Sequence, residues 1–211
     1  NFGKNQSELI SKIKAAKPDM IALTGDIVDE DHDSISSVED LLKGIKDLAP
    51  IYFVTGNHEL TSLAATQYQE LLALFQKYGV TDLDNDSVKL KKGGQSITLY
   101  GRQYFSQYLT DSLPIASDKD FDILLYHGSD NFKEIAPYHY DLILSGHAHG
   151  GIVRLPIWGG IFGNDGTFFP EYAGGEYTIG DATLISSRGL GDASIPRFNN
   201  PPELVVIKLN P

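Results

Sequence analysis

Three stretches in the first half of the chain carry apolar side chains at helical spacing. They cover residues 5–14, 36–45 and 61–78. Such spacing predicts helices that each bury one face. Asn5 with Glu8, and Ser36 with Glu39, have the three-residue separation of helix-start signals. We therefore predict that Asn5 and Ser36 cap the first two helices.

Short apolar runs lie between and after the predicted helices. They cover residues 20–24, 51–55, 121–126 and 141–145. Apolar runs of this length that end at turn-forming residues are typical of buried strands. Strands that alternate with helices predict a layered α/β fold.

The chain from about residue 151 onward is rich in glycine and aromatic side chains. Its short alternating runs, such as 151–155 and 204–208, predict antiparallel strands joined by long loops. No internal repeat, low-complexity tract or linker divides the sequence. We therefore expect a single domain over residues 1–211.

Composition narrows the classes of partner. The net charge of −11 argues against a nucleic-acid polymer, because proteins that bind one usually present a basic surface. The chain contains no cysteine, so a metal ion would be bound by nitrogen and oxygen ligands. No apolar run reaches the roughly 18 residues needed to cross a bilayer, and the start of the chain has no secretory signal pattern.

Potential metal ligands beside a glycine follow the four strand-like runs. They occur in Gly25-Asp26, Gly56-Asn57-His58, His127-Gly128 and Gly146-His147-Ala148-His149. Because the carboxyl ends of strands line the ligand crevice of an open α/β sheet, we expect these side chains to gather around one point. Imidazole, carboxylate and amide oxygen together suit divalent ions such as Mn, Fe or Zn. Two such ions about 3.5–4 Å apart can hold a phosphate ester, and Asp26 has two oxygens with which to bridge them.

Together these motifs resemble the second to fifth signature motifs of the calcineurin-like metallophosphoesterases, in the order found in that family. The resemblance begins at about Met20 and implies a layered α/β/β/α sandwich that hydrolyses phosphate esters with a metal-bound hydroxide. The stretches 150–156 and 187–191 further resemble the bacterial, membrane-associated branch typified by YkuE and YaeI. That branch implies a location at the cell envelope, with the cytoplasm as the alternative.

The resemblance implies a role for each matching residue. Asp26 would bridge two divalent ions. The other ligands would be Asn57, His127 and His147 at the second ion and His149 at the first. His58 would be a general acid or a stabilising imidazolium near the leaving group, and Asp29 would orient it. Glu59 is expected to be a local cap for the following helix.

The family pattern also includes an Asp-x-His motif on a first strand, which supplies two ligands to the first ion. Residues 1–18 contain neither Asp nor His. We therefore expect a chain that starts just past that strand, with the second metal site better retained than the first. Weak or absent activity would follow, and the oligomeric state is left open.

Substrate recognition leaves several alternatives open. Arg154, Arg188 and Arg197 could bind a substrate phosphate or pair with surface carboxylates. The aromatic segment 158–172 could be a packed loop or an apolar ledge that faces lipid. The substrate could be a small or lipid-linked phosphate ester or pyrophosphate, or a nucleotide cleaved by a phosphodiesterase. A non-catalytic module that binds a single metal ion is the alternative outside the enzymes.

Overall fold

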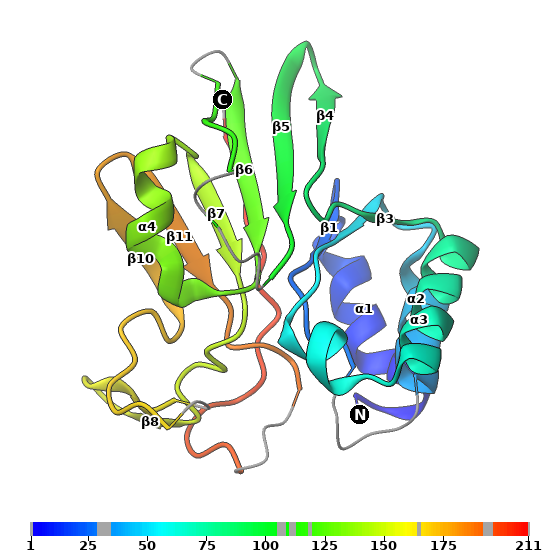
Figure 1. Ribbon diagram of the computed structural model, residues 1–211. Helices are drawn as coiled ribbons and strands as arrows, with labels where there is room; N and C mark the ends of the chain where they lie inside the picture. Colours follow the sequence, from blue (N-terminus) through cyan, green and yellow to red (C-terminus); the bar gives the residue numbers. More distant parts are fainter. Residues whose placement is uncertain are drawn as a thin grey trace.

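The computed structural model describes residues 2–28, 35–104, 109, 113–117, 120–163, 166–191 and 196–210. It confirms the predicted layered α/β/β/α fold. Two β-sheets face each other, and helices cover the outer face of each sheet (Figure 1). No helix in these ranges is both long and apolar enough to cross a membrane.

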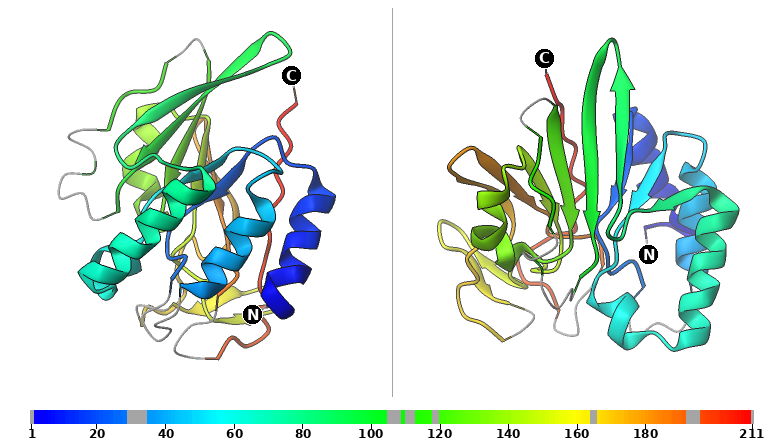
Figure 2. Two further views of the ribbon diagram at one scale, coloured as in Figure 1. Left: turned by 90° about the vertical axis from the view of Figure 1, so that its right-hand side faces the viewer. Right: turned by 45° about the horizontal axis from the view of Figure 1, so that its top comes forward.

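The smaller sheet has three parallel strands in the order β1-β2-β3. They are β1 (Ile21–Leu23), β2 (Ile51–Phe53) and β3 (Val80–Asp82). Three helices lie together on its outer side (Figure 2). They are α1 (Ser7–Ala16), α2 (Ser36–Ile45) and α3 (Ala65–Tyr78), accompanied by the short turns η1 (Lys4–Gln6) and η2 (His58–Ser62).

The larger sheet has six strands in the order β10-β11-β7-β6-β5-β4. They are β4 (Ser87–Lys92), β5 (Gln95–Arg102), β6 (Phe121–Tyr126), β7 (Leu142–Ser145), β10 (Gly175–Ile179) and β11 (Ala182–Ser186). The four inner strands are parallel, whereas the two edge strands are antiparallel to their neighbours. Its outer face packs against α4 (Phe132–Ile135), next to the turns η3 (Ser129–Asn131) and η4 (Ala136–Tyr138). A separate antiparallel pair is formed by β8 (Val153–Leu155) and β9 (Gly159–Phe162).

Alternation along β2 explains the layers. Ile51 and Phe53 point towards the helices, where the Phe53 and Phe75 rings lie 4.7 Å apart. Tyr52 and Val54 point the other way, into the core between the two sheets. Successive side chains of a strand face opposite sides, so one apolar run serves two cores. Full burial of a side chain the size of Phe53 contributes about 1.5–3 kcal/mol to stability.

The predicted helix caps are wrong. The N-cap residues, which immediately precede α1 and α2, are Gln6 and Ile35. Neither side chain makes a capping hydrogen bond. Gln6 instead accepts a hydrogen bond from the Phe2 backbone N–H at 3.0 Å. Glu39, expected to complete the second cap, binds Lys77 at 2.7 Å. Glu39 thus contacts the neighbouring helix α3 and does not complete the cap of its own helix.

The strand predicted over 204–208 is also wrong, because no part of the described range 201–210 forms a helix or a strand. Leu204 packs against the helices that cover the small sheet, whereas Val206 is 56% exposed. A strand requires a hydrogen-bonded partner as well as an alternating pattern. The other run, 151–155, does contain a strand, β8.

Candidate metal centre

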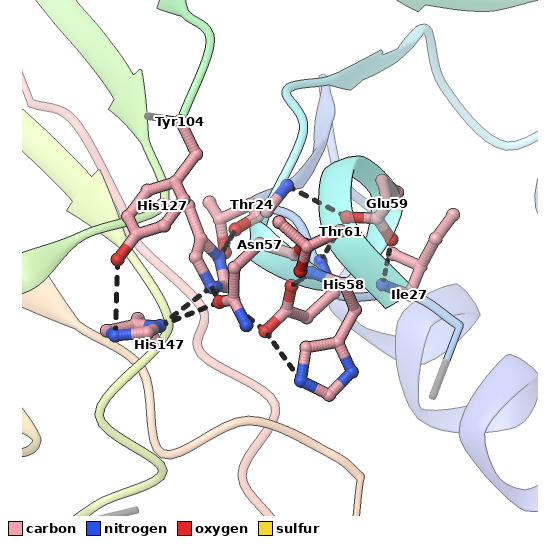
Figure 3. A network of polar contacts seen from close by, with 11 residues as sticks. Thr24, Ile27, Asn57, His58, Glu59, Thr61, Tyr104, His127 and His147 are labelled. Carbon is pink, nitrogen blue, oxygen red and sulfur yellow. Dashed lines mark hydrogen bonds and ion pairs between the residues drawn. The ribbon is translucent and has the colours of Figure 1, made fainter. Parts of the chain in front are cut away.

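Loops at the carboxyl ends of strands from both sheets converge on one point (Figure 3). Asp26 and Asn57 follow β1 and β2 of the smaller sheet, whereas His127 and His147 follow β6 and β7 of the larger one. The predicted convergence of strand ends therefore takes place across two facing sheets.

Four oxygen and nitrogen atoms form a compact donor group. His127 Nε2 lies 3.0 Å from Asp26 Oδ2, 3.2 Å from Asn57 Oδ1 and 3.2 Å from His147 Nδ1. Asn57 Oδ1 lies 3.0 Å from His147 Nδ1. Ligand atoms bound to one ion at about 2.0–2.2 Å lie about 3–3.5 Å apart in tetrahedral or octahedral geometry. The spacing of the donor group fits a divalent ion.

Proton positions in the donor group favour a cation. His127 Nδ1 lies 2.6 Å from the Thr24 carbonyl oxygen, so the proton of a neutral ring is held at Nδ1. Nε2 then turns a lone pair towards the lone pairs of Asp26 Oδ2 and Asn57 Oδ1. A positive charge, either a second proton or a metal ion, removes that repulsion. Among the described residues, Asp26, His127 and His147 can each offer one ligand atom, all within 4.8 Å of one another.

Asp26 is suited to remain ionised. Burial acts to raise the pKa of Asp26, but the His127 imidazole and the backbone N–H and imidazole of His58 outweigh it and lower that pKa. The His58 N–H donates to Asp26 Oδ1 at 2.9 Å. Asp26 also has a left-handed backbone, with φ at 52°. Such a conformation in a residue other than glycine is typical of functional sites.

The structure places the His58 side chain beside the donor group. His58 Nε2 lies 3.9 Å from Asp26 Oδ2, and its side chain is 22% exposed. The imidazole is therefore within reach of both the donor group and a ligand from solution. Asp29, predicted to orient His58, lies outside the described residues, so its role stays a prediction.

Two glycines allow the loops to approach each other. A Cβ on Gly25 would lie 2.5 Å from the Gly56 nitrogen and 2.7 Å from His127 Nδ1. A Cβ on Gly56 would lie 2.6 Å from the Asp26 nitrogen. Both positions must therefore lack a side chain.

Glu59 is a structural residue that sequence reasoning underestimated. Its side chain is 3% exposed, and its carboxylate accepts the backbone N–H groups of Gly56, Asp26 and Ile27, each at 2.8 Å. Burial and the charge of Asp26 raise the pKa of Glu59, and the three N–H donors oppose that rise. Glu59 thus connects the loop after β1 to the loop after β2. The only feature of the sequence that could have indicated this role is the position of Glu59 directly after Asn57 and His58.

His149, predicted as a ligand of the first ion, is not part of the three-residue group of Asp26, His127 and His147. Its carbonyl oxygen accepts hydrogen bonds from Asn200 at 2.6 Å and from Arg197 at 3.4 Å. Burial, followed by the Arg197 charge, lowers the pKa of His149 to about 4. His149 is therefore a neutral imidazole at pH 7.

The three arginines considered for substrate binding make contacts within the protein, and Arg197 donates to the Arg188 carbonyl oxygen at 2.7 Å. Arg154 donates to the Gly150 carbonyl oxygen at 2.7 Å. Arg188 forms an ion pair with Glu203 at 2.8 Å. Of the two possibilities raised for this arginine, a substrate phosphate or a carboxylate of the protein, the structure shows the second. Their predicted role in substrate binding stays a prediction.

Tyr104 was missed by the sequence analysis. It follows β5, and its hydroxyl lies 3.4 Å from His147 Nε2 (Figure 3). The Tyr104 ring meets the His127 ring edge to face, with 5.1 Å between centroids. Like the ligands, Tyr104 comes just after a strand, but β5 mixes polar and apolar residues and had not been predicted.

Comparison with known proteins agrees with this geometry. A model of the calcineurin-like phosphoesterase family matches residues 4–151. The metallophosphoesterase YkuE of Bacillus subtilis is 30% identical over 209 residues, which cover 95% of this chain and 71% of YkuE. The phosphodiesterase YaeI of Escherichia coli is 27% identical over 195 residues, covering 92% of this chain and 71% of YaeI.

A solved structure supports the same fold. The sulfate thiohydrolase SoxB of Thermus thermophilus superposes with a TM-score of 0.52 at 17% identity, covering 86% of this chain and 37% of SoxB. At that identity the likeness concerns the fold alone. The family match spans most of the chain and includes all four residues of the donor group. The chain therefore belongs to the calcineurin-like phosphoesterase family, which implies that it binds divalent metal ions.

Proposed function

We propose that this protein hydrolyses phosphate esters with the help of a divalent ion held by Asp26, Asn57, His127 and His147. The observation that carries the proposal is the separation of 3.0–3.2 Å between neighbouring atoms of the donor group. A bound ion of the Mn, Fe or Zn class supplies a Lewis acid that polarises a phosphoryl oxygen and activates water.

Two residues at the donor group have further roles in the proposed hydrolysis. Asp26, held ionised, would offset part of the charge of the ion and help to hold it in the donor group. His58 is close enough to Asp26 and exposed enough to reach a leaving group. Its role is to donate a proton to the leaving oxygen as the phosphorus–oxygen bond breaks.

The first experiment measures hydrolysis of an aryl phosphate monoester and diester with and without Mn²⁺. We expect weak turnover that depends on the metal and is lost in His127→Ala but kept in His139→Ala, whose side chain is exposed. Metal binding without hydrolysis of either ester would favour a non-catalytic module. Hydrolysis of diesters alone would favour a phosphodiesterase, including one for nucleotides.

We further propose that one ion binds tightly and a second binds weakly. Support comes from His149, which is not in the donor group, and from Asp26 Oδ1, which already accepts the His58 N–H. Elemental analysis after dialysis should give about one Mn²⁺ per chain, with a second bound only in excess metal. Two ions retained per chain would contradict this proposal.

A lipid-linked phosphate ester is the substrate class that we propose, with the protein bound peripherally to a membrane. Support comes from the loop between β8 and β9, where Ile157 is fully exposed and Trp158 is 67% exposed. Phe168 and Phe169 are also exposed, at 72% and 55%. A projecting apolar loop can enter a bilayer without a complementary pocket.

Vesicle sedimentation tests the lipid proposal. Wild-type protein should sediment with phosphatidylcholine–phosphatidylglycerol vesicles, and the Ile157→Ser/Trp158→Ser variant should stay in the supernatant. The control is Ile115→Ser, because Ile115 is also exposed but lies outside this loop. Loss of vesicle binding in this control would indicate non-specific adhesion. Absence of wild-type binding would leave only soluble phosphate esters as substrates.

A further inference from the structure

Tyr104 lies at the donor group although it is outside the four motifs that contain the donor residues. Its hydroxyl oxygen is 3.4 Å from His147 Nε2, and its ring centroid is 5.3 Å from that of His147. The same ring stands perpendicular to His127. Tyr104 thus contacts both histidines of the donor group (Figure 3).

The two nitrogens of His147 face different partners. Nδ1 lies 3.0 Å from Asn57 Oδ1 and 3.2 Å from His127 Nε2, so it belongs to the donor group. Nε2 faces the Tyr104 hydroxyl. A neutral imidazole carries one N–H, and a metal ion binds the other nitrogen through its lone pair. The proton must therefore be at Nε2 for Nδ1 to bind an ion.

We infer that Tyr104 is a positioning residue for His147. The Tyr104 oxygen accepts the Nε2–H of His147, which favours the tautomer with a bare Nδ1 and fixes the direction of the ring. A histidine ligand of a metal ion commonly donates its outer N–H to such a partner, and removal of that partner weakens metal binding about 10–100-fold. The inference rests on the proposed metal site.

The matched variants are Tyr104→Phe and Tyr126→Phe. Each removes one hydroxyl and keeps the ring, and the two rings are neighbours with 5.9 Å between centroids. The Tyr126 hydroxyl, however, donates to Asn131 at 3.2 Å and not to a histidine of the donor group. A general effect of losing a tyrosine hydroxyl in this cluster would appear in both variants.

Calorimetric titration of the metal-free protein with Mn²⁺ gives the first readout. We expect Tyr104→Phe to raise the dissociation constant at least about 10-fold, with Tyr126→Phe close to wild type. Equal affinity of wild type and Tyr104→Phe would overturn the inference but leave the proposed function intact. Absence of Mn²⁺ binding in the wild type would overturn both.

Nitrogen NMR of the His147 ring gives the second readout, which a merely structural role would not change. In metal-free wild type Asn57 Oδ1 lies 3.0 Å from Nδ1 and favours a proton there, so the ¹⁵N shifts should show both tautomers, with a clear share of the ring protonated at Nε2. In Tyr104→Phe the share of the Nδ1–H tautomer should rise. A wild-type ring protonated only at Nδ1 would overturn the inference even if Tyr104→Phe failed to fold.

Discussion

The buried Glu59 carboxylate accepts the backbone N–H of Asp26 at 2.8 Å. The side chain that fixes the backbone of Asp26 therefore also carries a carboxylate, which is 3% exposed and is not part of the donor group. The contact joins the loop after β1 to the loop after β2, and it helps hold Asp26 in a left-handed conformation.

Glu59→Gln tests this relationship. One face of a glutamine side chain carries N–H donors, so at least one of the N–H groups of Gly56, Asp26 and Ile27 would lose its acceptor. A buried donor left without a partner costs about 1–3 kcal/mol. Urea unfolding of the metal-free protein should show a loss of that size. Glu134→Gln, at an exposed position, should change stability by less than about 0.5 kcal/mol.

Gly56→Ala should disrupt the donor group. The new Cβ would lie 2.6 Å from the Asp26 nitrogen, so the Asp26 loop must move. We expect Mn²⁺ affinity to fall at least about 10-fold, because ligand geometry determines metal affinity. Gly191→Ala, where a Cβ meets no atom of the described residues within 4 Å, is the matched control. A titration with wild-type affinity for Gly56→Ala would contradict the close packing of these loops.

His58→Ala should separate proton donation from metal binding. Mn²⁺ affinity should stay within about twofold of wild type, because His58 is not in the donor group. Loss of a general acid typically lowers kcat by about 10²–10⁴-fold. The loss should be larger for phenyl phosphate than for 4-nitrophenyl phosphate, whose leaving group needs less help from a proton. An equal loss for both esters would favour a stabilising imidazolium over a general acid.

The Arg188–Glu203 pair should make stability depend on pH. The hydrogen bond and charge of Arg188 lower the pKa of Glu203 despite partial burial. The stabilisation is therefore present above the unfolded pKa of about 4.3 and is lost as pH falls through the lower folded value. Wild type should be more stable than Glu203→Gln at pH 7, and this difference should shrink towards pH 3. A difference independent of pH would indicate packing instead of charge.

The apolar pattern of the sequence was enough to predict the layers. Residues 51–54 alternate between the helix core and the core between the sheets, and the period of a strand requires that alternation. The same local pattern predicted that polar residues follow the strand ends. The second helix cap failed because Glu39 pairs with Lys77 of another helix, and the run at 204–208 failed because it has no strand partner among the described residues.

Only the tertiary structure decided which polar residues meet. Asp26 and His127 belong to facing sheets, and their 3.0 Å separation depends on how those sheets pack, which no local pattern records. The partners of Glu59, the pairing of Arg188 with Glu203 and the contact of Tyr104 with His147 have the same origin. The sequence by itself determined the residue types and their places at strand ends. Packing of two sheets determined which of them form the donor group, because side-chain distances are set by contacts between segments remote in the chain.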